Sequence, residues 1–122
     1  MIIDAHQHVN WLGMSVEDVI ANMDEHGIDK SWILTWEGPP AERDLYYARV
    51  GDPRFDNFAL SAVVDACQKY PDRLISGYAP DPRDPRSVGR LEAAVELFGV
   101  KVCGEWKYRM PVDSPECIEL FQ

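Results

Sequence analysis

Four short apolar segments alternate with segments of helical periodicity, and this alternation limits the fold more than any other feature of the chain. Each strand-then-helix pair takes about 30 residues, as is typical of a βα unit. Repeated units of this kind indicate a parallel sheet covered by helices. The predicted strands are residues 1–5, 30–36, 73–79 and 100–105; the predicted helices run from Ser15 to a stop at Gly27, over 56–70, over 85–98, and from a start at 114–116.

Local signals mark the helix ends. Ser15 and Asp18 have the spacing of a capping box, and Gly27 is a typical helix stop. A serine, a proline and a glutamate at 114–116 form a second helix start. The sequence therefore fixes the beginning of at least two helices without reference to the rest of the fold.

The length decides how much of such a fold the chain can build. A complete (β/α)8 barrel needs about 250 residues, and this chain has 122. We expect an α/β fold of the TIM-barrel type with only the first four βα units present, which is a half barrel. Residues 1–122 would form one partial domain that ends in mid-helix. The alternative is a flavodoxin-like open sheet, but no Gly-rich phosphate loop follows the first strand to support it.

The net charge limits the kinds of partner that the protein is expected to bind. Asp and Glu outnumber Lys and Arg by 21 to 12, which gives a net charge of −9. This balance disfavours binding to nucleic acid or to an anionic membrane, while a small anionic substrate remains compatible. We find no secretory signal and no apolar run of the roughly 20 residues that a membrane span needs. Three widely spaced cysteines fit reduced thiols, so we expect a cytoplasmic protein.

Two histidines follow the first apolar segment, at His6 and His8. Side chains two positions apart on a strand point the same way, so both imidazoles should project from the tip of the first strand. A pair of neutral imidazoles forms half of a divalent metal site. The alternative is that they are ordinary polar residues at the start of a loop.

The fourth predicted strand brings a carboxylate to the same level. Lys101, Cys103 and Glu105 share one face, with Glu105 at the strand tip, where it could complete or bridge a histidine site. The alternatives for Glu105 are a solvated loop residue, or a partner of Lys107 or Arg109. We expect Lys101 to be buried.

Substrate-binding candidates lie after the strands. The loop that follows the second strand has about 20 residues, and its Arg43 could hold a substrate carboxylate. Trp11 and Trp106 lie near strand ends and could line a pocket. A solvated loop for Arg43 and simple rim packing for the tryptophans remain the alternatives.

Two segments carry a resemblance to a known family. The opening Ile2-Ile3-Asp4-Ala5-His6-Gln7-His8 resembles the first strand of the amidohydrolase superfamily. The stretch Tyr70-Pro71-Asp72-Arg73-Leu74-Ile75-Ser76-Gly77-Tyr78-Ala79-Pro80 resembles its amidohydrolase-related branch, which includes decarboxylases of the aminocarboxymuconate-semialdehyde type. Gly104-Glu105 is also similar to the fourth-strand motif of TatD-like deoxyribonucleases, whose glutamate binds metal.

The resemblance implies a metal-dependent TIM barrel that carries zinc, or alternatively manganese, on the first-strand histidines. It also implies later ligands and an aspartate base, all expected beyond Gln122, so the catalytic residues of this chain are unknown. We expect a metal-dependent hydrolase that acts on a small organic acid, lactone or amide through a metal-activated water. The alternatives are a non-oxidative decarboxylase on the same scaffold, or a catalytically incomplete half barrel that self-associates into a homo-oligomer through its unpaired strand edges.

Overall fold

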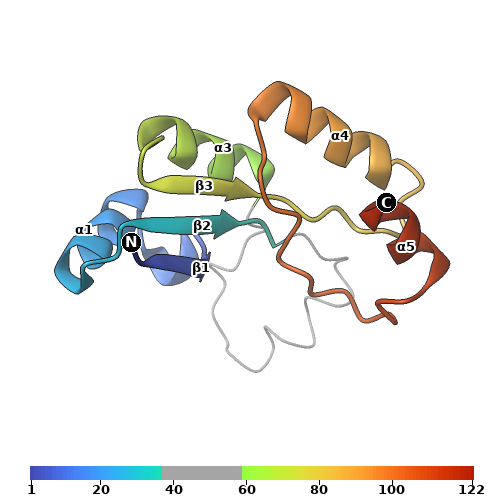
Figure 1. Ribbon diagram of the computed structural model, residues 1–122, viewed down its shortest axis with the longest axis horizontal. Helices are drawn as coiled ribbons and strands as arrows, with labels where there is room; N and C mark the ends of the chain where they lie inside the picture. Colours follow the sequence, from blue (N-terminus) through green and yellow to red (C-terminus); the bar gives the residue numbers. More distant parts are fainter. Residues whose placement is uncertain (37–58) are drawn as a thin grey trace.

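The computed structural model describes residues 1–36 and 59–122, and Figure 1 shows the arrangement of their helices and strands. Three strands form a parallel sheet in the order β1-β2-β3. The alternation of strands and helices predicted from the sequence is confirmed, whereas the half barrel stays a prediction. The strands are β1 (Ile3–Gln7), β2 (Lys30–Leu34) and β3 (Leu74–Gly77); the helices are α1 (Val16–His26), α3 (Leu60–Lys69), α4 (Ser87–Phe98) and α5 (Pro115–Phe121), with a 3-10 turn, η1, at Trp11–Gly13.

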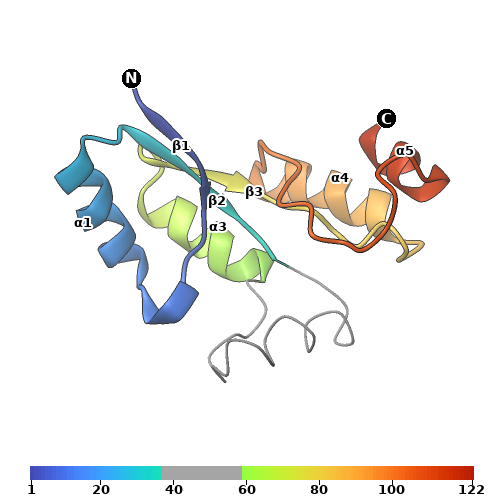
Figure 2. The ribbon, with the colours of Figure 1, turned by 90° about the horizontal axis from the view of Figure 1, so that it is seen from below.

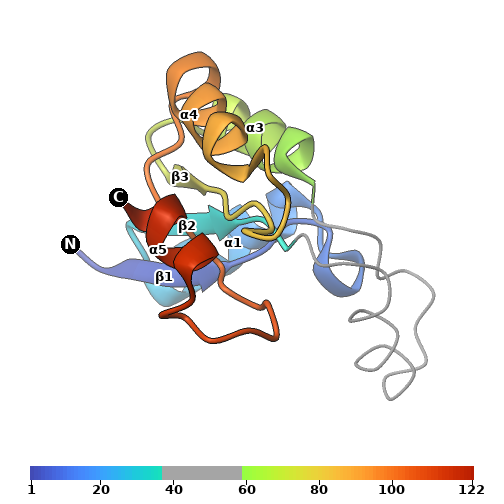
Figure 3. The ribbon, with the colours of Figure 1, turned by 90° about the vertical axis from the view of Figure 1, so that its right-hand side faces the viewer.

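The core lies between the sheet and the helices α1 and α3, which Figure 2 shows along the same side of the strands. It joins apolar side chains from each of these elements, and burying them drives the helices onto the sheet. A second, smaller cluster places α4 beside α3, as Figure 3 shows. The first cluster contains Val9, Val19, Met23, Ile33, Val63, Ala66 and Leu74, and the second contains Tyr78, Ala94 and Val100.

The helix ends follow the local signals. Ser15 caps α1 by accepting a hydrogen bond from the Asp18 amide, and Asp18 returns the contact to the Ser15 amide. Gly27 ends α1 with a φ of 67°, and Ser114 caps α5. The expected start of the second helix at 56–58 lies outside the described residues.

The first strand is displaced by two residues from its expected position at 1–5, because β1 covers Ile3–Gln7. Its register against β2 shifts by one residue between Asp4 and Gln7, which marks a bulge. The backbone goes on pairing with β2 after the apolar side chains end. Hydrogen-bonded pairing, rather than side-chain polarity, therefore sets the end of this strand, and His6 lies inside it.

The fourth strand predicted at 100–105 was wrong, because only Val102 forms a bridge, with Gly77. Around this bridge the Val102 amide donates to Ser76, and the Val102 carbonyl accepts from Tyr78. The Gly104 amide donates to the Tyr78 carbonyl, which is the first hydrogen bond of what would be the next bridge. A second bridge would need an amide N–H at Pro80, and proline has none. On the other side, the Val100 amide donates to the end of α4 at Ala94 instead.

None of the helices in residues 1–36 and 59–122 is long and apolar enough to span a membrane.

Candidate metal centre

The two histidines of the first strand lie side by side at its carboxyl end. His6 is within β1 and His8 follows it directly. Their ring centroids are 5.2 Å apart and the ring planes meet at 80°. His6 is half-exposed, whereas His8 is buried. The placement predicted for the two imidazoles is thus what the structure has, despite the bulge earlier in the strand.

Glu105 reaches both rings from a segment that pairs with β3, at the opposite edge of the sheet from β1. Its Oε2 lies 3.0 Å from the Nε2 atom of His6 and 3.0 Å from that of His8. Three strand spacings, about 14 Å in a flat sheet, would separate β1 from the segment that pairs with β3. Contact between their side chains therefore requires the chain beyond the Val102 bridge to leave the sheet and cross the ends of the strands. Figure 1 shows the chain after α4 running down past the carboxyl ends of β3 and β2.

Backbone contact fixes the tautomer of His8. Its Nδ1 lies 2.9 Å from the Leu34 carbonyl oxygen at the end of β2. Because a carbonyl can only accept, Nδ1 must carry the proton and donate it. In the neutral ring, Nε2 is then the unprotonated nitrogen, and it lies 3.0 Å from Oε2 of Glu105. Metal-binding histidines are oriented in the same way by a hydrogen bond from their second nitrogen.

The carboxylate of Glu105 is held in its charged form. Burial alone would raise its pKa, but the Lys107 ammonium, whose Nζ lies 2.9 Å from Oε1, lowers the pKa. The buried Oε2 nevertheless accepts no well-aligned hydrogen bond among the described residues. The Nε2 atoms of both histidines thus face an anionic oxygen at contact distance, an arrangement that a shared cation satisfies.

Donor type and spacing agree with that conclusion. The ligand atoms of His6, His8 and Glu105 all lie within 4.8 Å of one another. Two imidazoles and one carboxylate form a common set of protein ligands for a catalytic metal. The three side chains therefore fit a divalent ion.

The predicted tryptophans occupy different places. Trp11 stacks on the His8 ring, with centroids 5.6 Å apart, and on Trp36, at 5.5 Å. Trp106 instead packs against Tyr108 and Phe121. Trp11 therefore lies at the histidine site, whereas the Trp106 ring contacts Tyr108 in its own segment and Phe121 of α5. Arg43 lies outside the described residues.

Two contributors were not singled out by the sequence. Lys107 places its Nζ 2.9 Å from Oε1 of Glu105; the sequence offered it only as an alternative partner. The Leu34 carbonyl has no sequence signal at all, because any residue carries one. Lys101, expected to be buried, is exposed.

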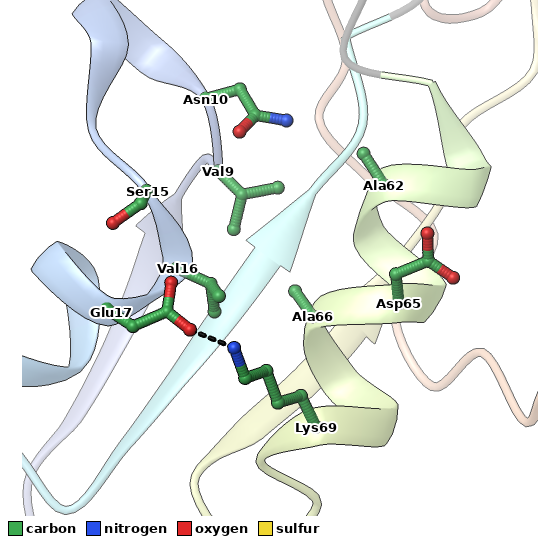
Figure 4. A pocket seen from close by; sticks show the side chains of 9 residues that line it. All are labelled: Val9, Asn10, Ser15, Val16, Glu17, Ala62, Asp65, Ala66 and Lys69. Carbon is green, nitrogen blue, oxygen red and sulfur yellow. Dashed lines mark hydrogen bonds and ion pairs between the residues drawn. The ribbon is translucent and has the colours of Figure 1, made fainter.

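A separate pocket of about 280 Å³ lies between α1 and α3, as Figure 4 shows. An ion pair between Glu17 and Lys69 crosses it. None of the three candidate ligands lines it, so it is distinct from the metal centre. Its lining residues are Val9, Asn10, Ser15, Val16, Glu17, Ala62, Asp65, Ala66 and Lys69.

Comparison with solved structures finds enzymes with a similar fold. A 5-carboxyvanillate decarboxylase from Novosphingobium aromaticivorans, complexed with manganese and 4-hydroxy-3-methoxy-5-nitrobenzoic acid, is 30% identical, with a TM-score of 0.61 over 88% of this chain and 31% of that chain. A 2,6-dihydroxybenzoate decarboxylase from Rhizobium is 17% identical, with a TM-score of 0.62 over 98% of this chain and 45% of that one. A probable 2-pyrone-4,6-dicarboxylic acid hydrolase from Acinetobacter baumannii is 16% identical, with a TM-score of 0.56 over 98% and 43%.

These structures are TIM-barrel enzymes of the amidohydrolase superfamily, and the resemblance to that superfamily seen in the sequence is confirmed. The chain spans less than half of the length of each of the three. No family model matches the chain, and no curated protein matches it either.

Proposed function

We propose that His6, His8 and Glu105 bind a divalent metal ion in an amidohydrolase-superfamily enzyme that acts on a small organic acid, lactone or amide. The contact of both Nε2 atoms with one buried carboxylate oxygen carries this proposal. A cation bound between the three groups would have two imidazole nitrogens and one carboxylate oxygen as ligands. The hydrogen bond from His8 to Leu34 supports it, because it presents the unprotonated Nε2 to the ion.

The ligand set is compatible with more than one metal. Imidazole suits zinc, which the sequence resemblance favours, while carboxylate also suits manganese. The 30% identical decarboxylase was crystallised with manganese. We therefore propose zinc or manganese, with the manganese of this neighbour as the reason to test both.

Two reactions are compatible with such a centre. A bound divalent ion supplies Lewis acidity, which can activate water for hydrolysis or hold a substrate carboxylate during decarboxylation. Hydrolysis is the expectation from the sequence. The solved neighbours include decarboxylases as well as a probable hydrolase, so decarboxylation is the second candidate. In either case the stacked Trp11 and Trp36 would form an apolar wall beside the His8 ring.

Metal content tests the site. The chain is loaded with Mn²⁺ or Zn²⁺, desalted and analysed for metal, together with a His6→Ala/His8→Ala double variant. We expect stoichiometric metal in the wild type and loss in the variant. The matched control is His26→Ala, because His26 lies at the end of α1 and its Nδ1 contacts the Asn22 carbonyl instead. Equal metal in the double variant and the control would remove the site assignment.

A product assay separates the two reactions. The metal-loaded protein is given hydroxylated aromatic carboxylic acids, with carbon dioxide measured, and in parallel lactones of small organic acids, with ring opening measured. Carbon dioxide release alone favours the decarboxylase, and ring opening alone favours the hydrolase. Activity that persists in the His6→Ala/His8→Ala variant would contradict a metal-dependent reaction at this site.

A further inference from the structure

Lys107 contacts the metal centre at two points without being one of the candidate ligands. Its Nζ lies 2.9 Å from Oε1 of Glu105, the carboxylate oxygen that faces away from the histidines. The same Nζ lies above the ring of Trp36, 3.8 Å from the ring centroid. An ammonium at that distance over an indole is attracted to the ring face. The lysine head is thus held between an anion and an aromatic surface.

The Trp36 ring, over which the Lys107 ammonium lies, is itself held in place by its surroundings. Its side chain is buried, with 8% exposure, and its ring stacks on Trp11 at an angle of 26°. Trp11 in turn stacks on His8. A flexible lysine stem that ends on such a surface loses much of its freedom, because moving the head would break both contacts. The position of Nζ therefore follows from the aromatic stack beside the histidines.

The consequence falls on the two oxygens of Glu105. The two oxygens of a carboxylate are equivalent, but the plane of the group can rotate about its side-chain bond. With one oxygen held by the Lys107 ammonium, this rotation is restricted, and the other oxygen lies 3.0 Å from both imidazoles. Lys107 thereby fixes the orientation in which the carboxylate is offered to an ion.

We propose that Lys107 is a positioning residue of the metal centre, anchored on Trp36, and that it orients Glu105 for metal binding through Oε1. This inference rests on the proposed function, because it concerns the same site. It goes beyond that proposal by assigning a role to a residue that is not a ligand.

Charge and positioning predict opposite results when this lysine is removed. An ammonium close to a metal ion repels it, so loss of the charge alone would tighten metal binding. Loss of positioning would weaken it, since removing a group that orients a ligand typically costs about 10- to 100-fold in metal affinity. The sign of the change therefore separates the two roles.

The test is calorimetric titration of the full chain with Mn²⁺, and absorption spectroscopy with Co²⁺ as a probe of the ligand field. We expect Lys107→Met to weaken Mn²⁺ binding by about 10-fold or more and to change the Co²⁺ spectrum. Lys107→Arg should restore both, because a guanidinium also pairs with carboxylates and stacks on aromatic rings. Lys101→Met is the matched control, since it makes the same change of charge at an exposed lysine of the same segment.

The outcomes are distinct. Equal or tighter Mn²⁺ binding by Lys107→Met than by Lys101→Met overturns the positioning role, as does an Arg variant no better than the Met variant. If the wild type takes up neither ion, the proposed function itself fails, and this inference fails with it. Thermal unfolding of the metal-free variants checks folding, and a Lys107→Met variant that unfolds like Lys101→Met assigns any loss of affinity to the site.

Discussion

The apolar core and the metal centre of this protein are assembled from different parts of the chain. The core joins α1, β2, α3 and β3 with Val9, which lies between β1 and η1. The metal centre joins the end of β1 to a segment beyond α4. Core residues such as Val19, Ile33 and Val63 have no exposed surface, whereas the His6 side chain keeps 56% of its own.

This difference shows which physical effect stabilises each of the two regions. The core is stabilised by the burial of apolar surface, which has no preferred direction. The free-energy cost of a core substitution therefore depends on the volume of the side chain that it removes. The centre depends on a few directional contacts to His8 and Glu105, and so on where the backbone presents them. A substitution can therefore damage one region and spare the other.

The largest effect on stability is expected in the core. Met23→Ala removes a side chain that is 2% exposed, and it should lower the free energy of unfolding by about 2–5 kcal/mol. His6→Ala at the half-exposed end of β1 should cost less than about 1 kcal/mol while removing metal binding. Urea denaturation of the metal-free proteins measures both. Similar losses in the two variants would show that the regions are not independent.

Gly77 links the two regions and should give the next largest effect. A Cβ atom there would overlap Leu34 Cδ2 and would lie 3.4 Å from both the Gly104 carbonyl oxygen and Val102 Cβ. Gly77→Ala should therefore cost about 1–3 kcal/mol. It should also weaken metal binding, because Leu34 orients His8 and Gly104 precedes Glu105.

The matched control for this prediction is Gly89→Ala, within α4. Apart from the backbone of α4 itself and the adjacent residues, no atom of the described residues lies within 4 Å of the added methyl group, and alanine is the better helix former. It should stabilise the protein by about 0.5–1 kcal/mol and leave metal affinity unchanged. Urea denaturation and Mn²⁺ titration of both variants check the pair. A Gly77→Ala variant with unchanged stability and affinity would contradict the link.

The smallest effect belongs to a surface turn outside both regions. Hydrogen bonding from Arg86 lowers the pKa of Asp84 to about 2 from an ordinary value of 3.8. A lowered carboxyl pKa stabilises the folded state above the ordinary value, and this contribution is lost as the pH falls from about 4 towards 2. Asp84→Asn should therefore make the melting temperature slightly less sensitive to pH in that window. Parallel profiles for the variant and the wild type would exclude the contribution.

Sequence patterns predicted the parts of this protein that depend on neighbouring residues. The capping box at Ser15, the stop at Gly27 and the start at Ser114 are local, and the structure has all three. The fourth strand was wrong because its continuation depends on the partner residue, Pro80, rather than on its own apolar composition. Whether a strand forms depends on both of the segments that pair, so the pattern within one segment is not enough to predict it.

The sequence by itself determined the repeated βα units, the apolar faces of the helices and the candidate ligands His6, His8 and Glu105. Periodicity and residue chemistry are local properties that can be read directly from the sequence. Only the tertiary structure decided that Glu105 meets both histidines, since this contact needs the segment beyond Val102 to cross the carboxyl ends of the strands. It alone also decided the proton position on His8 and the place of Lys107 on Trp36. These features depend on backbone carbonyls and ring surfaces, which any sequence contains, and only folding gives them a position.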